Sequence, residues 1–367
     1  MKGADSRVLP FYSTTCLEMN NQNTRILLDC ERMKYPHTGL YHFCLQLGKA
    51  LQERKGPNEE ITYFLPPGAE KVFGEAPVRQ QTILHKFHLP ITADIWHCTY
   101  QNTHYFPFRS KAKKILTVHD LNFLHEFKSE KKKQRYLDSL QKKIDHSDAV
   151  VAISNYVRKE LMEFLDLSGR RVEVIYNGCN IQDSVSPRKP SFAVDRPFLL
   201  SIGTVVPKKN FHVLPAALLH NDYDLLIVGI ADNEAYRKKI WEEATRLGVQ
   251  DRTRIIGPVT EEEKYWLLQN CELFCFPSLA EGFGLPVIEA MHFGKNVLLS
   301  TATSLPEIGG PHAHYFQGFG AEEVSGTATS ALEKIQSEDN SREIKSWSEQ
   351  FSWRKTAEDY LELYRKL

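Results

Sequence analysis

Short β-prone segments alternate with segments of helical periodicity along most of this chain, and this alternation limits the fold more than any other feature. In the first half, apolar β-prone runs predict strands at residues 24–29, 61–65, 95–98, 115–119, 149–153 and 172–175. Helical patterns fall between several of them, at residues 40–51, 130–144 and 156–164. Strands that alternate with helices predict a parallel, doubly wound α/β sheet.

A second set of alternating elements follows a loose segment, residues 182–196, that contains proline, serine and lysine. Its predicted strands are residues 198–203, 224–229, 254–256, 273–277 and 296–300, with helices at 234–247 and 261–268. A chain of 367 residues is long enough for two such domains. We therefore expect an N-terminal domain at 24–185, a C-terminal domain at 196–350 and a last amphipathic helix at 351–367, after a poorly patterned leader at 1–23.

Charge and cysteine content exclude several classes of protein. The 46 Lys and Arg residues balance 46 Asp and Glu residues, so the molecule as a whole is not built to bind a polyanion. The seven cysteines include no Cys-x-x-Cys pair, which argues against a disulfide framework or a zinc site and favours a reducing compartment.

The first residues lack the apolar core of a signal peptide, and no run of 18 apolar residues occurs. We expect a cytoplasmic protein that does not span a membrane.

Residues 277–291 carry the strongest functional signal. The predicted strand at 273–277 leads into a loop with two glycines, then Pro286 at the expected first helical position and Gly294 where a helix would stop. The free amides and positive end of such a helix favour an anion, most often phosphate. This predicts that the main chain from Gly282 through Phe283 and Gly284 to Leu285 binds phosphate.

Two acids border the same predicted anion site. Glu281 lies in the loop and Glu289 lies one turn into the helix. Because phosphate is itself negative, the two carboxylates are useful there only if they bind another part of the ligand, and the hydroxyl groups of a sugar and of a ribose are the natural candidates. The alternative is an ordinary strand-to-helix turn with acids present by chance.

The string Pro-Ser-x-x-Glu-Gly-Phe-Gly-Leu-Pro-x-x-Glu-Ala-Met, with its Glu281-x7-Glu289 spacing, resembles the retaining GT-B glycosyltransferases (glycosyltransferase family 4, group 1 glycosyltransferases). The resemblance implies two Rossmann-like domains facing each other across a cleft, with the C-terminal helix crossing back to the N-terminal domain. It also implies transfer of a sugar from a nucleotide donor to a hydroxyl with retained configuration, without a metal or another cofactor. Glu289 would then bind the ribose, and Glu281 would hold the donor sugar and assist catalysis.

The segment from Gly203 to Asn210 ends a predicted strand and places two lysines just beyond it. The carboxyl edge of a parallel sheet is where α/β folds bind ligands, and a lysine there can neutralise a departing diphosphate. In the family pattern, Lys209 matches the phosphate-binding lysine. Many members have arginine where Thr204 stands, so whether Lys208 replaces that cation is open. A solvated turn with two lysines is the alternative for this segment alone.

Three further positions complete the predicted site. His119 ends a predicted strand within Val-His-Asp, which resembles the family motif whose histidine faces the donor sugar from the opposite domain, while Asp120 is expected to orient local backbone. Gly39 opens a predicted helix where the backbone could approach a phosphate. Gly257 and Val259 lie in a segment that resembles the loop whose main chain meets the nucleobase.

Two other sequence patterns are typical of different functions. Asp222-Tyr223-Asp224 spells the acid-x-acid pattern of metal-dependent transferases, but it leads into a predicted strand, and we expect a turn instead. Residues 111–143 include ten Lys and Arg residues but only four Asp and Glu residues. This region could contact anionic lipid or an anionic acceptor, and a solvated helix face is an equal alternative. It lacks an aromatic recognition pattern, so we expect no nucleic-acid partner.

The sequence thus predicts an enzyme whose partners are a nucleotide-sugar donor and a glycan or lipid-linked acceptor in surface polysaccharide or lipopolysaccharide assembly. The Gly-Thr and Lys-Lys-Asn form is similar to bacterial mannosyltransferases, which favours GDP-mannose. The alternatives are a UDP-, dTDP- or ADP-sugar donor, a nucleotide-sugar epimerase on the same architecture, or a non-catalytic protein that binds nucleotide sugars.

Overall fold

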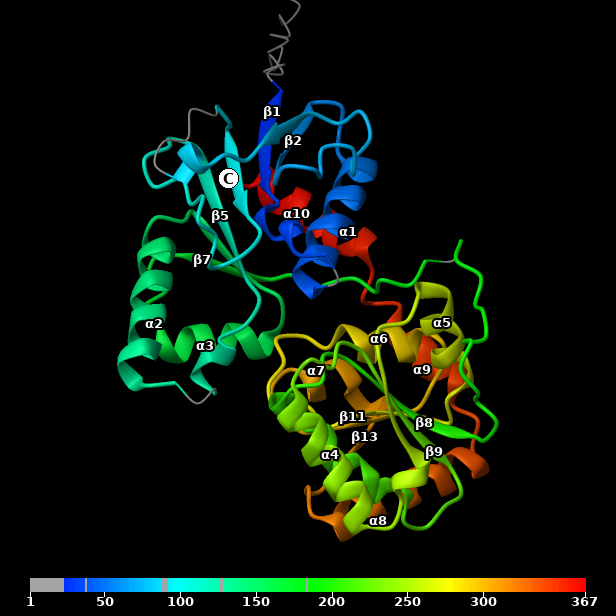
Figure 1. Cartoon of the computed structure of the whole chain (residues 1–367). Helices are drawn as coiled ribbons and strands as arrows, with labels where there is room; N and C mark the ends of the chain where they lie inside the picture. The colour runs from blue at the N-terminus through cyan, green and yellow to red at the C-terminus, as the bar shows by residue number, and fades with distance from the viewer. Residues whose placement is uncertain (1–22, 37, 87–91, 126–127, 183) are drawn as a thin grey trace, which may run out of the picture.

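The computed structural model describes residues 23–36, 38–86, 92–125, 128–182 and 184–367, so the predicted leader lies outside the described residues apart from Asn23. Two α/β units make up the molecule, the first coloured blue to green and the second green to orange (Figure 1). In both units every strand pairing is parallel. The predicted doubly wound fold in two domains is therefore confirmed.

The N-terminal sheet has seven strands in the order β3-β2-β1-β4-β5-β6-β7. The strands are β1 Thr24–Asp29, β2 Glu59–Leu65, β3 Val78–Gln80, β4 Ile95–Cys98, β5 Lys113–Val118, β6 Ala149–Ala152 and β7 Arg171–Val174. The strand β3 was not predicted, because three residues at a sheet edge, none of them buried, leave no hydrophobic pattern.

Helices α1 Gly39–Arg54, α2 Glu130–Asp145 and α3 Asn155–Phe164 accompany this sheet, with short 3-10 turns η1 Glu31–Lys34, η2 Ile83–Lys86 and η3 Asn122–Leu124. Helix α1 begins where the Thr38 hydroxyl accepts a hydrogen bond from the amide of Tyr41 at 3.2 Å. Its apolar stripe, which includes Phe43, Leu47 and Leu51, is buried. The N-terminus of α1 is thereby fixed at the end of β1, at the carboxyl edge of the sheet.

The C-terminal sheet has six strands in the order β10-β9-β8-β11-β12-β13. The strands are β8 Phe198–Ile202, β9 Asp224–Val228, β10 Thr253–Ile256, β11 Leu273–Phe276, β12 Val297–Leu299 and β13 His314–Tyr315. The helices are α4 Glu234–Arg246, α5 Glu261–Asn270, α6 Leu285–His292, α7 Leu305–Gly309, α8 Ala321–Ser337 and α9 Ser341–Ser348. The 3-10 segments are η4 Pro207–Lys209, η5 Phe211–Leu218, η6 Gln250–Arg252 and η7 Gly310–His312. Strand β8 follows the predicted linker, and β9 begins at Asp224, so the acid-x-acid pattern leads into a strand as expected.

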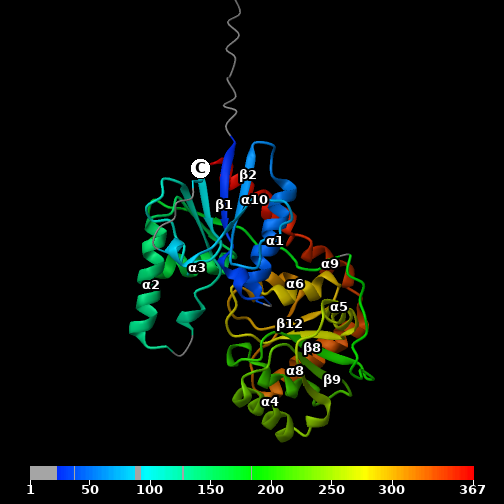
Figure 2. The same ribbon diagram turned by 45° about the horizontal axis from the view of Figure 1, so that its top comes forward.

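The last helix, α10 Trp353–Arg365, leaves the C-terminal domain and packs on the N-terminal one, where Figures 1 and 2 show it beside α1. Its Trp353, Tyr360 and Tyr364 belong to the same buried cluster as Phe43 of α1. The return of the C-terminal helix to the first domain is thus confirmed.

Side chains of both domains meet near the N-terminus of α3. The Glu307 carboxylate of α7 accepts hydrogen bonds from the Asn155 amide at 2.8 Å and from the Tyr176 hydroxyl at 2.6 Å. The Ser154 hydroxyl donates to the carbonyl of Gly282 at 2.9 Å. These contacts hold the carboxyl edges of the two sheets facing each other. Among the described residues, no helix combines the length and the apolar character needed to cross a membrane.

Candidate active site

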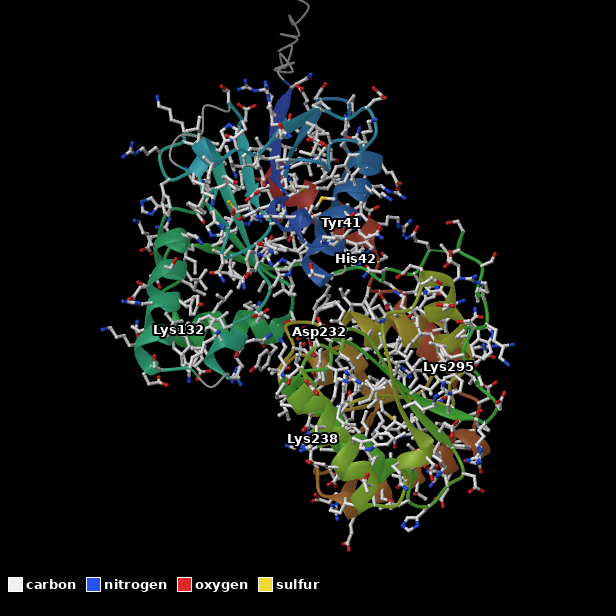
Figure 3. All side chains as sticks on the ribbon, in the orientation of Figure 1. Tyr41, His42, Lys132, Asp232, Lys238 and Lys295 are labelled. Carbon is white, nitrogen blue, oxygen red and sulfur yellow. The ribbon has the colours of Figure 1, made fainter. Side chains whose placement is uncertain are left out.

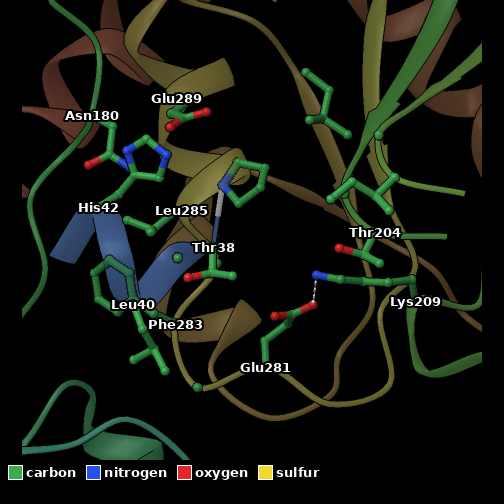
Figure 4. Close-up of a pocket in the computed structure, with 18 of the residues that line it drawn as sticks. Thr38, Leu40, His42, Asn180, Thr204, Lys209, Glu281, Phe283, Leu285 and Glu289 are labelled. Carbon is green, nitrogen blue, oxygen red and sulfur yellow. Dashed lines mark hydrogen bonds and ion pairs between the residues drawn. The ribbon is translucent and has the colours of Figure 1, made fainter. Parts of the chain in front are cut away.

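A cavity of about 570 Å³ lies between the two domains, at the carboxyl edges of both sheets. It takes in nearly all the predicted site residues: Gly39, His119, Gly203, Thr204, Lys208, Lys209, Val259, Glu281, Gly282, Phe283, Gly284, Leu285 and Glu289. Gly257 is not among its lining residues, although its neighbours Pro258 and Val259 are. Figure 4 shows α1 residues approaching the cavity from one side, and Thr204 and Lys209 from the other.

The loop between β11 and α6 forms the floor of this cavity. Gly284 is the N-cap of α6 with φ of 120°, a conformation that favours glycine, and Pro286 is the second helical residue rather than the expected first. Among the described residues, the amides of Gly282, Phe283 and Gly284 make no hydrogen bond. Free amides at the positive end of a helix are suited to an anion.

Lys209 and Glu281 form an ion pair within this cavity. The Lys209 Nζ lies 2.5 Å from Glu281 Oε1, and the Ser278 hydroxyl donates to the same oxygen at 2.5 Å. Both charged side chains are about one-seventh exposed, at 13% and 14%, and the Lys209 ammonium also lies 4.6 Å from the centre of the Phe276 ring. The predicted phosphate-binding cation and the predicted sugar-binding acid are therefore neighbours, each fixed by more than one contact.

Thr303 fixes the backbone of Glu281, a role that no sequence pattern predicted. Its hydroxyl accepts a hydrogen bond from the Glu281 amide at 3.0 Å. Thr303 has φ of 55°, an unfavourable conformation for a β-branched residue that the surrounding contacts must support. The next residue, Ser304, donates its hydroxyl to the Phe283 carbonyl at 2.8 Å. Together they support the loop that carries the free amides.

Glu289 is buried beneath the cavity wall with a lysine partner that the sequence analysis did not identify. Lys264 of α5 places its Nζ 3.4 Å from Glu289 Oε2 and 2.9 Å from Glu261 Oε2. Burial by itself lowers the pKa of Lys264, but the two carboxylates outweigh it and raise that pKa above its usual value. The lysine therefore stays charged and orients Glu289, and both Glu261 and Lys264 line the cavity.

His119 is buried at the end of β5, with its ring held on two sides. Its Nε2 is 2.8 Å from the Thr99 carbonyl, and the ring packs edge-on against Phe43 at 4.6 Å. Burial lowers the pKa of His119 to about 4, so the imidazole is neutral at neutral pH. A Cβ built on Gly282 would lie 1.9 Å from the His119 carbonyl oxygen, so only glycine allows this approach of the two domains.

The remaining predicted positions differ in their contacts and in their position relative to the cavity. Asp120 accepts a hydrogen bond from the Asn122 amide at 3.0 Å, a contact with the local backbone. Thr204 is exposed on the cavity wall, and the nearby Lys208 lines the cavity. Gly39 is the first residue of α1, and a Cβ there would meet only Leu285 of α6, at 4.0 Å. The N-termini of α1 and α6 thus lie next to each other in the cavity wall.

The basic region at 111–143 is less uniform than its composition suggests. Lys114 and Lys143 are buried, and their ammonium groups donate to main-chain carbonyls, including that of Gln101 at 2.7 Å from Lys143. These two residues therefore do not belong to a charged surface. The exposed cations of the region that lie on α2 are Lys131, Lys132, Arg135 and Lys142, and Figure 3 labels Lys132 there.

Comparison with known families and proteins agrees with this arrangement. Residues 40–183 match the model described as Glycosyltransferase Family 4, and residues 183–345 match Glycosyl transferases group 1. The O-antigen chain mannosyltransferase B of Escherichia coli is 25% identical over 392 residues, covering 94% of this chain and 100% of that protein. The O-antigen chain mannosyltransferase RfbU of Salmonella typhimurium is 24% identical over 196 residues, covering 53% of each chain.

Solved structures share the architecture over almost the whole chain. HepE of Anabaena, solved in complex with UDP and glucose, has a TM-score of 0.73 at 19% identity, covering 94% of this chain and 100% of that one. Sucrose-phosphate synthase of Thermosynechococcus elongatus has a TM-score of 0.74 at 17% identity, covering 94% and 99%. With two family domains in sequence and this two-domain architecture, the chain belongs to the group 1 glycosyltransferases of the GT-B fold.

Proposed function

We propose that this glycosyltransferase moves a mannosyl group from GDP-mannose to a hydroxyl of a glycan or lipid-linked acceptor, with retained configuration and without a metal, in the assembly of a surface polysaccharide. The observation that carries the proposal is the Lys209–Glu281 pair beside the free amides of the β11–α6 loop. That arrangement offers positive charge to a diphosphate and a carboxylate to the adjoining sugar in one cavity.

Each residue has a separate role in the proposed reaction. Lys209 and the loop amides stabilise the diphosphate as the bond from the anomeric carbon to the phosphate oxygen breaks. Glu281 accepts hydrogen bonds from the sugar hydroxyls and stabilises the positive charge that develops at the anomeric carbon. The acceptor oxygen then bonds to that carbon, and its proton passes to the departing phosphate oxygen. His119, which is neutral, contacts the same sugar from the N-terminal domain.

The nucleotide is held by the C-terminal domain in this proposal. The buried Glu289 carboxylate, oriented by Lys264, accepts hydrogen bonds from the ribose hydroxyls. The main chain near Gly257 and Val259 meets the base. The mannosyl assignment is supported by the names of the two O-antigen mannosyltransferases, whereas the UDP complex of HepE keeps a UDP-sugar as the alternative donor.

A cytoplasmic location with peripheral contact to an anionic membrane is part of the same proposal. Three exposed cations in the first half of α2, Lys131, Lys132 and Arg135, would supply the contact. Such an arrangement would bring the enzyme to a lipid-linked acceptor. Sedimentation with vesicles containing anionic lipid should be lost in a variant with all three cations changed to glutamine, and vesicles of neutral lipid serve as the control.

Thermal unfolding with GDP, UDP, dTDP, ADP and their sugar conjugates, in the presence of EDTA, tests the donor and the need for a metal. Selective binding to the native state raises the melting temperature, so a response to GDP and GDP-mannose alone is expected. A selective response to UDP or dTDP would assign the donor to that nucleotide instead of GDP. A response that requires Mg²⁺ would contradict the metal-free proposal. No response in folded protein would contradict the nucleotide-sugar assignment itself.

Two glutamine variants then separate the proposed roles. Glu289→Gln should weaken GDP binding by about tenfold or more, because hydrogen bonds to a charged group contribute ~1.5–3 kcal/mol. Glu281→Gln should mainly lower turnover and leave GDP affinity within about twofold. Calorimetric titration and nucleotide release measure the two effects. Nucleotide release that never needs an acceptor would favour an epimerase, and donor binding without turnover would favour a binding protein.

A further inference from the structure

A second cavity, of about 630 Å³, adjoins the donor cavity. Asn122, Val206 and Lys208 line both cavities, so the two spaces meet at these residues. The second cavity lies between the β5–α2 connection of the N-terminal domain and the η4 and α4 segments of the C-terminal domain. None of the residues predicted from the sequence, except Lys208, belongs to it.

Its walls combine apolar surface with cations. Pro207, Leu279 and Ala280 contribute apolar atoms, and Leu279 is 45% exposed. Lys208 and Lys239 contribute ammonium groups. No carboxylate side chain occurs among the described residues that line this cavity. A ligand with a hydrocarbon part and a negative charge would match both properties.

The acids nearest to these walls are already engaged. Glu160 of α3 lies behind His125, 2.5 Å from its Nε2, and also accepts a hydrogen bond from the Tyr156 hydroxyl at 3.0 Å. Glu243 of α4 is held by the guanidinium of Arg246, with one contact of 2.9 Å. Lys239 contributes to lowering the pKa of Glu243, and Lys208 opposes the rise in the pKa of Asp120, so both cations already feel a nearby carboxylate. Neither lysine forms an ion pair with a described carboxylate, so both ammonium groups can still contact a ligand.

One wall also carries an unsatisfied hydrogen-bond donor. Asn210 lines the cavity, is 4% exposed and adopts φ of 58°. Within the described part of the chain, its buried Nδ2 has no hydrogen-bond partner. Buried amide donors are almost always paired in native proteins, which makes Asn210 an exception on this wall.

We propose that this cavity holds the acceptor side of the reaction, as a subsite for an amphiphile that carries a phosphate next to a hydrocarbon chain. The inference rests on the proposed glycosyl transfer, because it assigns the acceptor of that reaction to the cavity that shares Asn122, Val206 and Lys208 with the donor site. The phosphate lies between Lys208 and Lys239, and the hydrocarbon packs on Pro207, Leu279 and Ala280. Lys208 thereby faces the donor diphosphate on one side and the acceptor phosphate on the other.

Binding of octyl phosphate, measured by calorimetric titration in the presence of saturating GDP, tests this subsite. The decisive variant is Lys239→Glu, and its matched control is Lys238→Glu. Lys238 is the adjacent residue on α4, labelled in Figure 3, and it pairs with Glu242 at 3.5 Å without lining the cavity. Both variants make the same change of charge on the same helix, so they separate a local contact from a general electrostatic effect.

We expect Lys239→Glu to weaken octyl phosphate binding at least about tenfold and Lys238→Glu to change it less than about twofold. Octyl glucoside and inorganic phosphate should each bind at least about tenfold more weakly than octyl phosphate, because each lacks one of the two groups. Equal losses in the two variants, displacement of octyl phosphate by GDP, or equal binding of either simpler probe would overturn the proposal.

Titration of the same variants with GDP distinguishes a failure of the proposed donor site from a failure of the proposed subsite in the second cavity. GDP affinity is expected to be unchanged in both, which also shows that the variants are folded. If GDP does not bind the wild-type protein, the proposed donor fails, and octyl phosphate titrated without GDP still decides whether the second cavity is a subsite for phosphate amphiphiles.

Discussion

At the scale of single residues, the site depends on groups that are far apart in sequence and in contact in space. Lys209 and Glu281 are separated by 72 positions, yet their charged atoms lie 2.5 Å apart in a site with little exposure to water. Low exposure strengthens the attraction and also raises the cost of leaving either group alone. The pair therefore holds a cation in position for the diphosphate.

Replacing Lys209 with methionine should lower kcat/KM by about 10²–10³-fold, as expected when one stabilising donor to a developing negative charge is lost. Lys208→Met is the matched comparison and should cost less, because Lys208 lines the wall and makes no ion pair among the described residues. Steady-state kinetics with a melting curve for each variant gives the comparison. A loss below about threefold for Lys209→Met, with a large loss for Lys208→Met, would reverse the two roles.

At the scale of elements, α10 joins the domains through a buried polar network in the N-terminal sheet. The Tyr364 hydroxyl lies 2.7 Å from His97 Nδ1, and Thr117 Oγ1 lies 2.8 Å from His97 Nε2. Burial lowers the pKa of His97 to about 3, so the ring is neutral and needs both partners to satisfy its nitrogens. The helix is thus held by specific hydrogen bonds as well as by its apolar face.

Tyr364→Phe should destabilise the protein by ~1–3 kcal/mol, because it leaves one nitrogen of His97 buried without a partner while the aromatic packing is kept. Urea unfolding followed by circular dichroism measures the change. Tyr136→Phe on α2 is the control, since its hydroxyl makes no hydrogen bond among the described residues. An unchanged unfolding midpoint for Tyr364→Phe would show that the network contributes no net stability.

At the scale of the whole molecule, the donor cavity exists only while the two domains face each other. Glu307 of α7 receives hydrogen bonds from the Asn155 amide, the Asn155 side chain, the Tyr156 amide and the Tyr176 hydroxyl, all in the N-terminal domain or its exit segment. A carboxylate at the N-terminus of α3 is also favoured by the helix dipole. One side chain therefore carries much of the polar contact between the domains.

Glu307→Ala should shift the population toward arrangements in which the domains separate, since each hydrogen bond to a charged group contributes ~1.5–3 kcal/mol. Small-angle X-ray scattering should show a larger radius of gyration than for the wild type. Glu333→Ala, an exposed position on α8, provides the matched control. The same scattering curve for all three proteins would mean that other contacts hold the domains.

Most elements could be predicted because their residues carry local signals. Predicted and observed ends of strands such as β1 Thr24–Asp29 and β4 Ile95–Cys98 coincide, since the buried residues of these parallel strands are mostly apolar. The β11–α6 loop was visible for a similar reason, through its glycines, proline and acids. The short edge strands β3 and β13 were missed, because two or three partly exposed residues carry no periodicity.

The partners of the site residues could not be predicted in the same way. Lys264, Thr303 and Asn210 belong to common residue types, and their significance lies in an ion pair, a positive φ and an unpaired amide that arise only when distant segments meet. By itself the sequence determined the two parallel sheets and the chemical groups at their carboxyl edges, because hydrophobic periodicity and turn residues act locally. Only the tertiary structure decided how those edges face each other, which charges pair, and that a second cavity opens beside the first. These features depend on packing between segments that are remote in the chain.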